Sequence, residues 1–422
     1  MSAPATTLAD RVLFGLFALF LLSSSFSIAL AQSSLGLALA VYIGILAVRR
    51  ENPFGGALRP VYLAIGLYVL WVLISALAGP TPGRSVLRER EDWLFLIIPI
   101  AVHLVRIEPF RRRLVRTLAI AVLLMGAYGV VQHFTGLNWP HATPPLKALE
   151  GGYIVQGSFA HRLTYGNYFA VASIFVLACG ILAAGRETGV WRRFLFLAAF
   201  VGLAATVLSY ARMALAGLPL ALLFLAALKG RRWLAAAAGA VAIGAVAVYL
   251  WVPGVAGGFR AALDRDLTGE NQASRTYIWE KSLAIVAENP ITGVGLGNFY
   301  EAYARQNDSL RGENRVWPHA HNDVLNVAAV AGIPGALLFV AMWVIVFWYL
   351  RRGWQRFRGD PAYRALIGAA MAASVMFALC SLSEAAFADE EPRQLLMGVW
   401  GMGLGWVNRP SEETPTAAGS AE

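Results

Sequence analysis

Two histidines stand two residues apart in a polar segment, residues 317–323, that reads Trp-Pro-His-Ala-His-Asn-Asp. A neutral imidazole is a natural general base near pH 7 because its unperturbed pKa is close to that value. In an irregular segment His319 and His321 can face one cavity, with Asn322 and Asp323 as supporting residues. Two other interpretations remain open: the histidines cap the helix that follows, or they bind a metal with Asp323 as a further ligand.

Three arginines are candidates for binding an anion. Arg162 and Arg212 lie where apolar stretches meet polar ones, and Arg275 begins a helix expected in the long outer loop. Arg212 stands between two apolar stretches with almost no loop. A charge near membrane depth costs free energy, so such a residue usually faces a cavity or a partner. Arginine forks match phosphate oxygens in pairs, so the three together could form an anion site. Taken singly, each fits a solvated charge or one that reaches the lipid headgroups. Candidate supporting residues in the same stretches are His161, Tyr210 and Arg265.

The composition is that of a membrane protein. Of the 422 residues 58% are hydrophobic and 14% are charged, and the mean hydropathy is +0.58, which favours an all-α, polytopic chain. In a membrane protein, basic residues mainly mark the segments on the cytoplasmic side of the membrane. The net charge of +10 therefore does not imply a nucleic-acid partner. Both cysteines fall in apolar stretches, which argues against a disulfide framework or zinc ribbon.

Apolar stretches of roughly 17–25 residues are long enough to cross a bilayer. We place twelve spans, at about 12–31, 33–48, 60–79, 93–108, 114–136, 163–184, 194–210, 212–228, 233–252, 332–350, 365–386 and 394–408. The first resembles a signal peptide but is longer than a usual signal core, and we interpret it as a retained helix.

The distribution of basic residues predicts the orientation of these spans. With the N-terminus inside, 21 of the 35 Lys and Arg fall on the inner side and 14 on the outer side. Seven of those 14 lie in one long loop, and the positive-inside rule does not count long loops. The short segments therefore hold 21 basic residues on the inner side and 7 on the outer side. Both termini are therefore expected in the cytoplasm.

Two outer segments are longer than turns: 137–162, and 253–331, which we expect to form a helical cap. Within the cap, apolar spacing predicts helices over 274–288 and 299–305, separated by glycines at 293, 295 and 297. The domain division is spans one to nine over 1–252, the large outer loop over 253–331, spans ten to twelve over 332–408, and a disordered cytoplasmic tail over 409–422.

Polar residues in or near the spans are few: His103, Gln132, His133 and Glu384. They do not form the line of titratable groups that a proton-coupled pump usually needs. The nearest approach in the outer loops to an acidic pair that binds a catalytic divalent ion is Asp264 with Asp266, which lie in a stretch of strongly mixed charge and do not indicate such a site.

Four motifs in a fixed order carry a family resemblance. They are Ser-Tyr-Ala-Arg at 209–212, Arg275 with Trp279, the run from Glu288 to Phe299, and His-Ala-His-Asn-Asp at 319–323 followed by Gly-Ile-Pro-Gly at 332–335. Together they resemble the O-antigen ligase/polymerase superfamily over about residues 205–345. The spacing from His321-Asn322 to Gly332 is similar to the histidine motif of the ligases.

The resemblance implies a metal-independent glycosyltransferase of GT-C-like architecture in the bacterial inner membrane, with no cofactor. The donor would be O-antigen on undecaprenyl pyrophosphate, the acceptor lipid A–core at the periplasmic face, and membrane lipids would surround both. His319 or His321 would be the general base, and the three arginines would bind the pyrophosphate. An O-antigen polymerase, a protein O-oligosaccharyltransferase and a lipid-linked glycan transporter are the alternatives.

Overall fold

The computed structural model describes residues 6–140, 145–149, 151–183, 189–251, 274–306, 316–357 and 359–407. Arg265, the tail over 409–422, and residues 253–273 and 307–315 of the expected cap lie outside this part of the chain. The helices are α1 (Leu8–Ser23), α2 (Ile28–Arg49), η1 (Gly56–Leu58), α3 (Arg59–Ala78), α4 (Pro82–Glu89), η2 (Arg90–Leu96), α5 (Ile97–Arg106), α6 (Glu108–Thr135), α7 (Arg162–Leu182), α8 (Gly189–Leu208), α9 (Arg212–Lys229), α10 (Arg231–Trp251), α12 (Arg275–Glu288), α13 (Phe299–Gln306), α14 (Asp323–Arg356), α15 (Pro361–Cys380) and α16 (Glu390–Leu404).

Eight of the described helices are long and apolar enough to cross a membrane: α2, α3 with the preceding η1, α6, α7, α8, α9, α14 and α15. This confirms the prediction of an all-α, multi-pass membrane protein. Twelve spans and a GT-C-like architecture stay predictions. Strands are limited, in the described residues, to the short antiparallel hairpin β1 (Ala148–Leu149) and β2 (Gly152–Tyr153).

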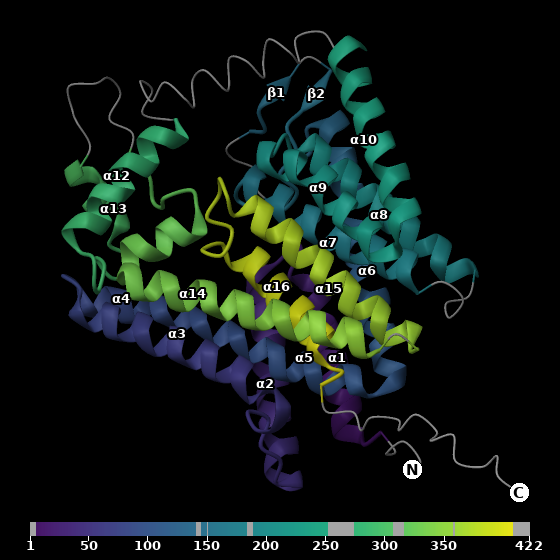
Figure 1. The fold of residues 1–422 in the computed structure, drawn as a ribbon, viewed down its shortest axis with the longest axis horizontal. Coiled ribbons are helices and arrows are strands. Elements are labelled where there is room, and N and C mark those ends of the chain that lie inside the picture. The colour runs from purple at the N-terminus through teal and green to yellow at the C-terminus, as the bar shows by residue number, and fades with distance from the viewer. Residues whose placement is uncertain are drawn as a thin grey trace, which may run out of the picture.

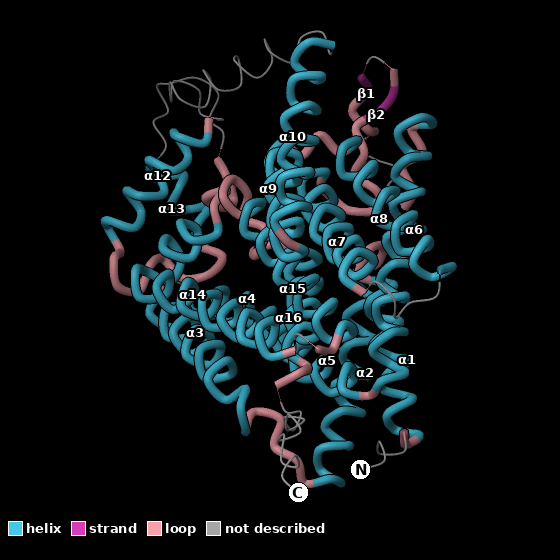
Figure 2. The backbone as a smooth tube through the Cα atoms, turned by 45° about the vertical axis from the view of Figure 1, so that its right-hand side comes forward, coloured by secondary structure: helices cyan, strands magenta, loops and turns pink. Residues whose placement is uncertain are grey.

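The helices are arranged around α7 and α15, whose apolar residues are mostly buried. Figure 1 shows α12 and α13 on the opposite side of the molecule from α6 to α10, while α3 and α14 run side by side. In Figure 2 the β1–β2 hairpin lies at the far end of the molecule from the start of α1.

The predicted boundary between the first two spans is wrong. It was expected near residue 32, but α1 ends at Ser23 and α2 begins at Ile28. The hydroxyls of Ser23, Ser24 and Ser25 donate to carbonyls of the preceding turn. Serines that bond back in this way compete with helix propagation. The Ser27 hydroxyl then accepts the N–H of Leu30 and caps α2.

The span expected over 332–350 belongs to a longer helix that is broken at Gly332. Residues from Asp323 onward are already helical, and Gly332 has φ 71°, ψ 178° inside α14. A Cβ there would overlap the carbonyl of Ile291, so only glycine fits this conformation. The break separates a short first half of α14 from the long apolar half that follows.

A glycine-rich loop completes the hydrogen bonds that the break leaves open. The N–H groups of Val294 and Gly295 donate to the carbonyls of Ala329 and Val330 at 2.9 and 2.8 Å. Gly293, Gly295 and Gly297 all have positive φ, which bends this loop around the helix. The Gly-x-Gly-x-Gly spacing, weakly suggestive of a nucleotide loop, thus has a structural role: it holds the first half of α14.

Two of the polar residues expected near spans also have structural partners. Gln132 accepts the N–H groups of Gln156 and Gly157 and donates to two carbonyls, which anchors the loop between α6 and α7. His103 lies 3.0 Å from a carboxylate oxygen of buried Asp10, and Arg49 donates to the same carboxylate.

Candidate active site

The histidine segment is fixed to the loop between α15 and α16. Asn322 caps α14 by accepting the N–H of Leu325 at 2.9 Å, and its Nδ2 donates to the Leu382 carbonyl at 3.1 Å. The buried Asp323 carboxylate accepts the Ser381 hydroxyl at 2.5 Å and the Phe387 N–H at 3.0 Å. The two predicted supporting residues therefore hold the segment in place.

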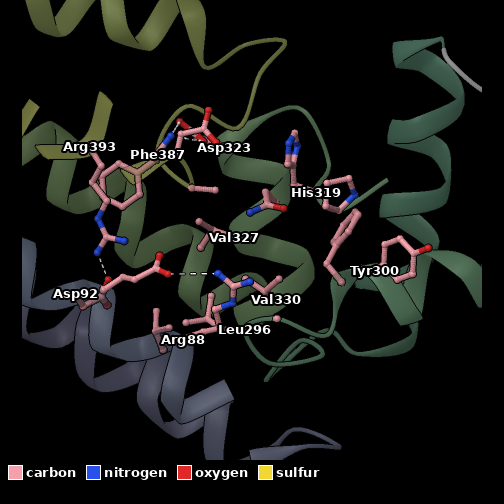
Figure 3. A pocket seen from close by; sticks show the side chains of 18 of the residues that line it. Arg88, Asp92, Leu296, Tyr300, His319, Asp323, Val327, Val330, Phe387 and Arg393 are labelled. Carbon is pink, nitrogen blue, oxygen red and sulfur yellow. Dashed lines mark hydrogen bonds and ion pairs between the residues drawn. The ribbon is translucent and has the colours of Figure 1, made fainter. Parts of the chain in front are cut away.

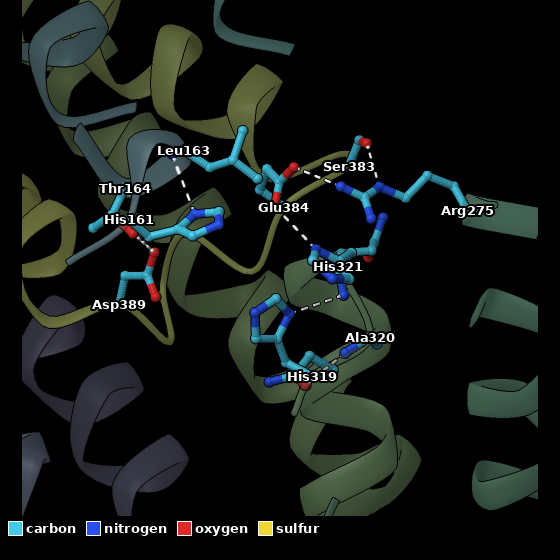
Figure 4. A network of polar contacts seen from close by, with 12 residues as sticks. His161, Leu163, Thr164, Arg275, His319, Ala320, His321, Ser383, Glu384 and Asp389 are labelled. Carbon is cyan, nitrogen blue, oxygen red and sulfur yellow. Dashed lines mark hydrogen bonds and ion pairs between the residues drawn. The ribbon is translucent and has the colours of Figure 1, made fainter. Parts of the chain in front are cut away.

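A buried carboxylate, Glu384, connects an arginine with a histidine. Its Oε1 accepts from Arg275 at 2.6 Å, and its Oε2 accepts from Nδ1 of His321 at 3.0 Å. Arg275 also donates to the Ser383 hydroxyl. Figure 4 shows the guanidinium and the imidazole converging on Glu384. Charge-assisted bonds of this kind are about twice as strong as neutral ones.

The bond to Glu384 fixes the tautomer of His321. Because Nδ1 donates, the lone pair of the neutral ring is on Nε2. That nitrogen is buried and has no hydrogen-bond partner among the described residues. The backbone at His321 has φ 51°, a left-handed conformation that is uncommon outside glycine and typical of strained functional positions.

His319 is held in the opposite tautomer. Its Nδ1 accepts the backbone N–H of His321 at 3.3 Å, so the neutral ring carries its proton on Nε2. The two imidazoles are in edge contact, with ring centroids 4.2 Å apart. The structure therefore assigns different capacities to the two rings: His321 presents an acceptor nitrogen and His319 a donor.

Both imidazoles are neutral at pH 7. Burial lowers the pKa of His319 to about 3, and the neighbouring His321 contributes to that lowering. Burial also lowers the pKa of His321, against the opposing effect of the Glu384 bond. Burial would raise the pKa of Glu384, but the bond from His321 and the charge of Arg275 outweigh it and lower that pKa. Glu384 is thus a carboxylate and His321 an available base.

The other expected residues surround this group to different degrees. His161 caps α7 by accepting the N–H of Leu163, and it interacts electrostatically with Glu384 and His321. Arg162 donates to the carbonyls of Ser209 and Tyr210 at 3.2 and 2.7 Å. Tyr210 adopts φ 52° and supplies that carbonyl from its backbone.

Arg212, which begins α9, is exposed and close enough to Arg162 for their charges to interact. Arg162 also interacts electrostatically with Glu384. The structure therefore brings Arg162, Arg212 and Arg275 into one neighbourhood around Glu384. The Glu384 carboxylate offsets the charge of Arg275 directly, whereas the two carbonyls bonded to Arg162 leave its positive charge in place.

The predicted position of Glu384 is wrong. It was counted within a span over 365–386, whereas α15 ends at Cys380 and Glu384 lies in the loop that follows. The sequence does contain a sign of its role, because a carboxylate so close to an apolar stretch normally requires a charged partner.

A cavity of about 290 Å³ opens beside His319. Figure 3 shows it between α4, α13, the first half of α14 and the loop before α16. Besides His319, its acidic and basic lining residues are Arg84, Arg88, Glu91, Asp92, Asp323, Asp389 and Arg393. Neither His321 nor Glu384 lines it, so His319 lies between this cavity and the Glu384 group.

The described residues contain no group of three His, Cys, Asp or Glu side chains placed to share a metal ion. The Asp323 carboxylate bonds Ser381 and Phe387 instead of approaching a shared site with the histidines. The metal interpretation of the segment gains no support from this geometry.

Residues 197–340 match the protein family described as O-antigen ligase. Over 331 residues the chain is 28% identical to the exopolysaccharide production protein ExoQ of Rhizobium meliloti (strain 1021); the match covers 73% of this chain and 69% of ExoQ. These two findings confirm the resemblance to the O-antigen ligase/polymerase superfamily and support a role in polysaccharide assembly. The family match contains Arg212, Arg275 and both histidines, whereas Glu384 lies beyond it.

Proposed function

We propose that this chain is an O-antigen ligase. It moves O-antigen polysaccharide from undecaprenyl pyrophosphate to a sugar hydroxyl of lipid A–core at the periplasmic face of the bacterial inner membrane. The observation that carries the proposal is the bonded series Arg275–Glu384–His321, in which one buried carboxylate joins a guanidinium to a neutral imidazole. The match of residues 197–340 to the O-antigen ligase family supports the reaction class.

His321 is the general base. Its Nε2 takes the proton of the acceptor hydroxyl as the hydroxyl oxygen attacks the anomeric carbon of the donor sugar. The new bond joins that oxygen to the anomeric carbon. The bond between that carbon and the pyrophosphate oxygen breaks, and its electron pair leaves with undecaprenyl pyrophosphate. The His321 imidazolium formed in this step is stabilised by the Glu384 carboxylate 3.0 Å away.

The arginines bind the donor pyrophosphate and stabilise the negative charge that grows as it leaves. Charges placed in advance in this way often make the greatest single contribution to catalysis. Arg162 is held by two backbone carbonyls and interacts with the charge of Arg212, which favours an anion between them. Arginine charge takes the place of a divalent ion, so the reaction is metal-independent and needs no cofactor.

The test is transfer by the purified protein in lipid nanodiscs. Lipid-linked O-antigen is mixed with rough lipopolysaccharide, and products are separated by size on a gel. We expect a ladder on lipid A–core that requires both substrates and the protein. Absence of a ladder with active donor and acceptor contradicts the ligase assignment.

A polymerase is the second candidate because the chain is similar to ExoQ, an exopolysaccharide production protein. In that reaction the acceptor is a second lipid-linked glycan and not lipid A–core. The same nanodisc assay without lipopolysaccharide separates the two reactions. Growth of lipid-linked chains in that arm, with no ladder in the other, identifies a polymerase.

A further inference from the structure

We infer that the cavity beside His319 binds the terminal sugar of the acceptor glycan; this rests on the proposed function. The cavity is formed by residues far apart in the chain, from α4 and η2, α13, the first half of α14 and the loop before α16. Its volume is at the lower end of the range for small-ligand sites, about 300–1,000 Å³, which suits a single sugar ring with its neighbours outside.

The charge of the lining favours a neutral ligand. Three arginines and four carboxyl groups face the cavity. The arginines are paired: Arg84 with Glu301, Arg88 with Glu91 at 3.4 Å, and Arg393 with Asp92. Because each of these arginines is already paired with a carboxylate, the cavity offers a pyrophosphate no surplus of positive charge. The donor phosphates therefore belong with Arg162, Arg212 and Arg275, and this cavity suits a hydroxylated, uncharged group.

The remaining lining residues have the chemistry that recognises sugars. The exposed ring of Tyr300 offers a flat apolar face for the C–H side of a pyranose. Tyr68 and Phe299 also line the cavity, but both rings are almost fully buried in its wall. Asp389, whose Oδ2 accepts the Thr164 hydroxyl, adds its Oδ1 as an acceptor for a sugar hydroxyl. Asn326, whose Oδ1 accepts the Ala320 N–H, adds its Nδ2 as a donor. A few placed polar groups among aromatic walls are the usual composition of a specific small-ligand site. Tyr300 is 48% exposed and therefore available to a ligand.

His319 connects this cavity with the base. It lines the cavity, and its ring is in contact with that of His321. In the tautomer fixed by its Nδ1 bond, Nε2–H of His319 donates to the oxygen of the attacking hydroxyl. That bond holds the hydroxyl at the side of the cavity nearest the His321 ring. His319 thus selects and orients the acceptor, while His321 removes the proton.

The test separates acceptor binding from catalysis. Transfer is measured in nanodiscs with the concentration of rough lipopolysaccharide varied at saturating lipid-linked O-antigen. A second series varies lipid-linked O-antigen at saturating rough lipopolysaccharide. Tyr300→Ala removes an aromatic face and should raise the KM for the acceptor about fivefold, equivalent to about 1 kcal/mol, with the kcat and the donor KM unchanged. Tyr300→Phe keeps the ring and should recover most of the acceptor affinity that Tyr300→Ala loses. Arg305→Gln, an exposed change on the same helix outside the cavity, is the control.

A change in the donor KM alone, or no change in the acceptor KM, would overturn the assignment. Binding of a soluble probe keeps the inference testable if transfer itself fails. The probe is the core oligosaccharide released from rough lipopolysaccharide by mild acid, with titration followed by calorimetry. Binding that Tyr300→Ala weakens supports the cavity even if no ladder forms, in which case only the ligase proposal fails. No binding, or binding unaffected by Tyr300→Ala, overturns the acceptor site.

Discussion

The Nδ1 atom of His321 donates to the Glu384 carboxylate over 3.0 Å, across a sequence separation of 63 residues. This bond sets the tautomer of the proposed base and places a negative charge where its imidazolium would form. It also depends on a loop that hydropathy alone assigns to a membrane span. The proposed chemistry of His321 therefore depends on the charge at residue 384.

Glu384→Gln removes the charge but keeps the shape of the side chain. We expect the kcat of transfer to fall about 10²-fold, because both the tautomer and the imidazolium lose their support. The Glu384 bond raises the His321 pKa against the effect of burial. Its loss should therefore move the acidic limb of the pH profile to lower pH. Glu280→Gln, an exposed carboxylate on α12, is the matched control. A pH profile of transfer that Glu384→Gln leaves unshifted contradicts a functional bond between Glu384 and His321.

Replacing the two histidines separately should give different kinetic results. His321→Ala removes the base, and the kcat should fall about 10²–10⁴-fold while the protein still inserts. His319→Ala should mainly raise the KM for the acceptor, and His319→Gln, which retains an N–H donor, should recover part of that loss. Insertion is checked by size-exclusion chromatography in detergent. Two fully active alanine variants would refute the general-base mechanism.

Arg212→Lys keeps a positive charge but loses the planar fork. Because arginine binds phosphate oxygens in pairs and lysine does not, we expect transfer to fall more than about tenfold, with the donor KM raised. Initial rates at varied lipid-linked O-antigen measure this. Arg231→Lys, at the start of α10 and on the predicted inner side, should have no effect. Near-normal transfer by Arg212→Lys would reduce Arg212 to an anchor at the membrane surface.

Gly332→Ala should lower stability. The position has φ 71°, and the added Cβ would overlap the Ile291 carbonyl. A strained backbone of this kind costs about 1–3 kcal/mol, so the melting temperature in detergent should fall. Gly36→Ala, where an added Cβ meets nothing within 4 Å, should leave it unchanged or raise it. Equal melting temperatures for the two variants would show that the break in α14 tolerates a side chain.

Transfer should persist after treatment with EDTA, because arginines are proposed to carry the charge stabilisation. The assay is the same gel ladder, run with and without chelator and with Mg²⁺ or Mn²⁺ restored. Loss of activity that either ion restores would overturn the metal-independent mechanism.

The sequence predicted helices well where apolar length decides the structure, as in α3, α7 and α9. It also predicted α12 and α13 from the spacing of residues such as Tyr277 and Ile285. It failed where short polar side chains end a helix, as at Ser23, because hydropathy alone does not detect that competition.

The candidate site was predicted by residue type but not by pairing. His319, His321 and Arg275 were identified from motifs, whereas the role of Glu384 depends on where α15 ends. The tautomers depend on single hydrogen bonds, which spacing does not encode. The two histidines are therefore equivalent in the sequence and become distinct only through their contacts in the fold.

The order in which the chain is made bears on the site. The partners of the histidine segment lie between Ser381 and Phe387, after α15. They are therefore synthesised after Arg275 and the two histidines. A nascent chain that has inserted α14 thus has the proposed base without its carboxylate. If His321 is the base, transfer requires that α15 has formed and that the loop after it contacts the histidines, so we expect a chain that stops before residue 384 to be inactive.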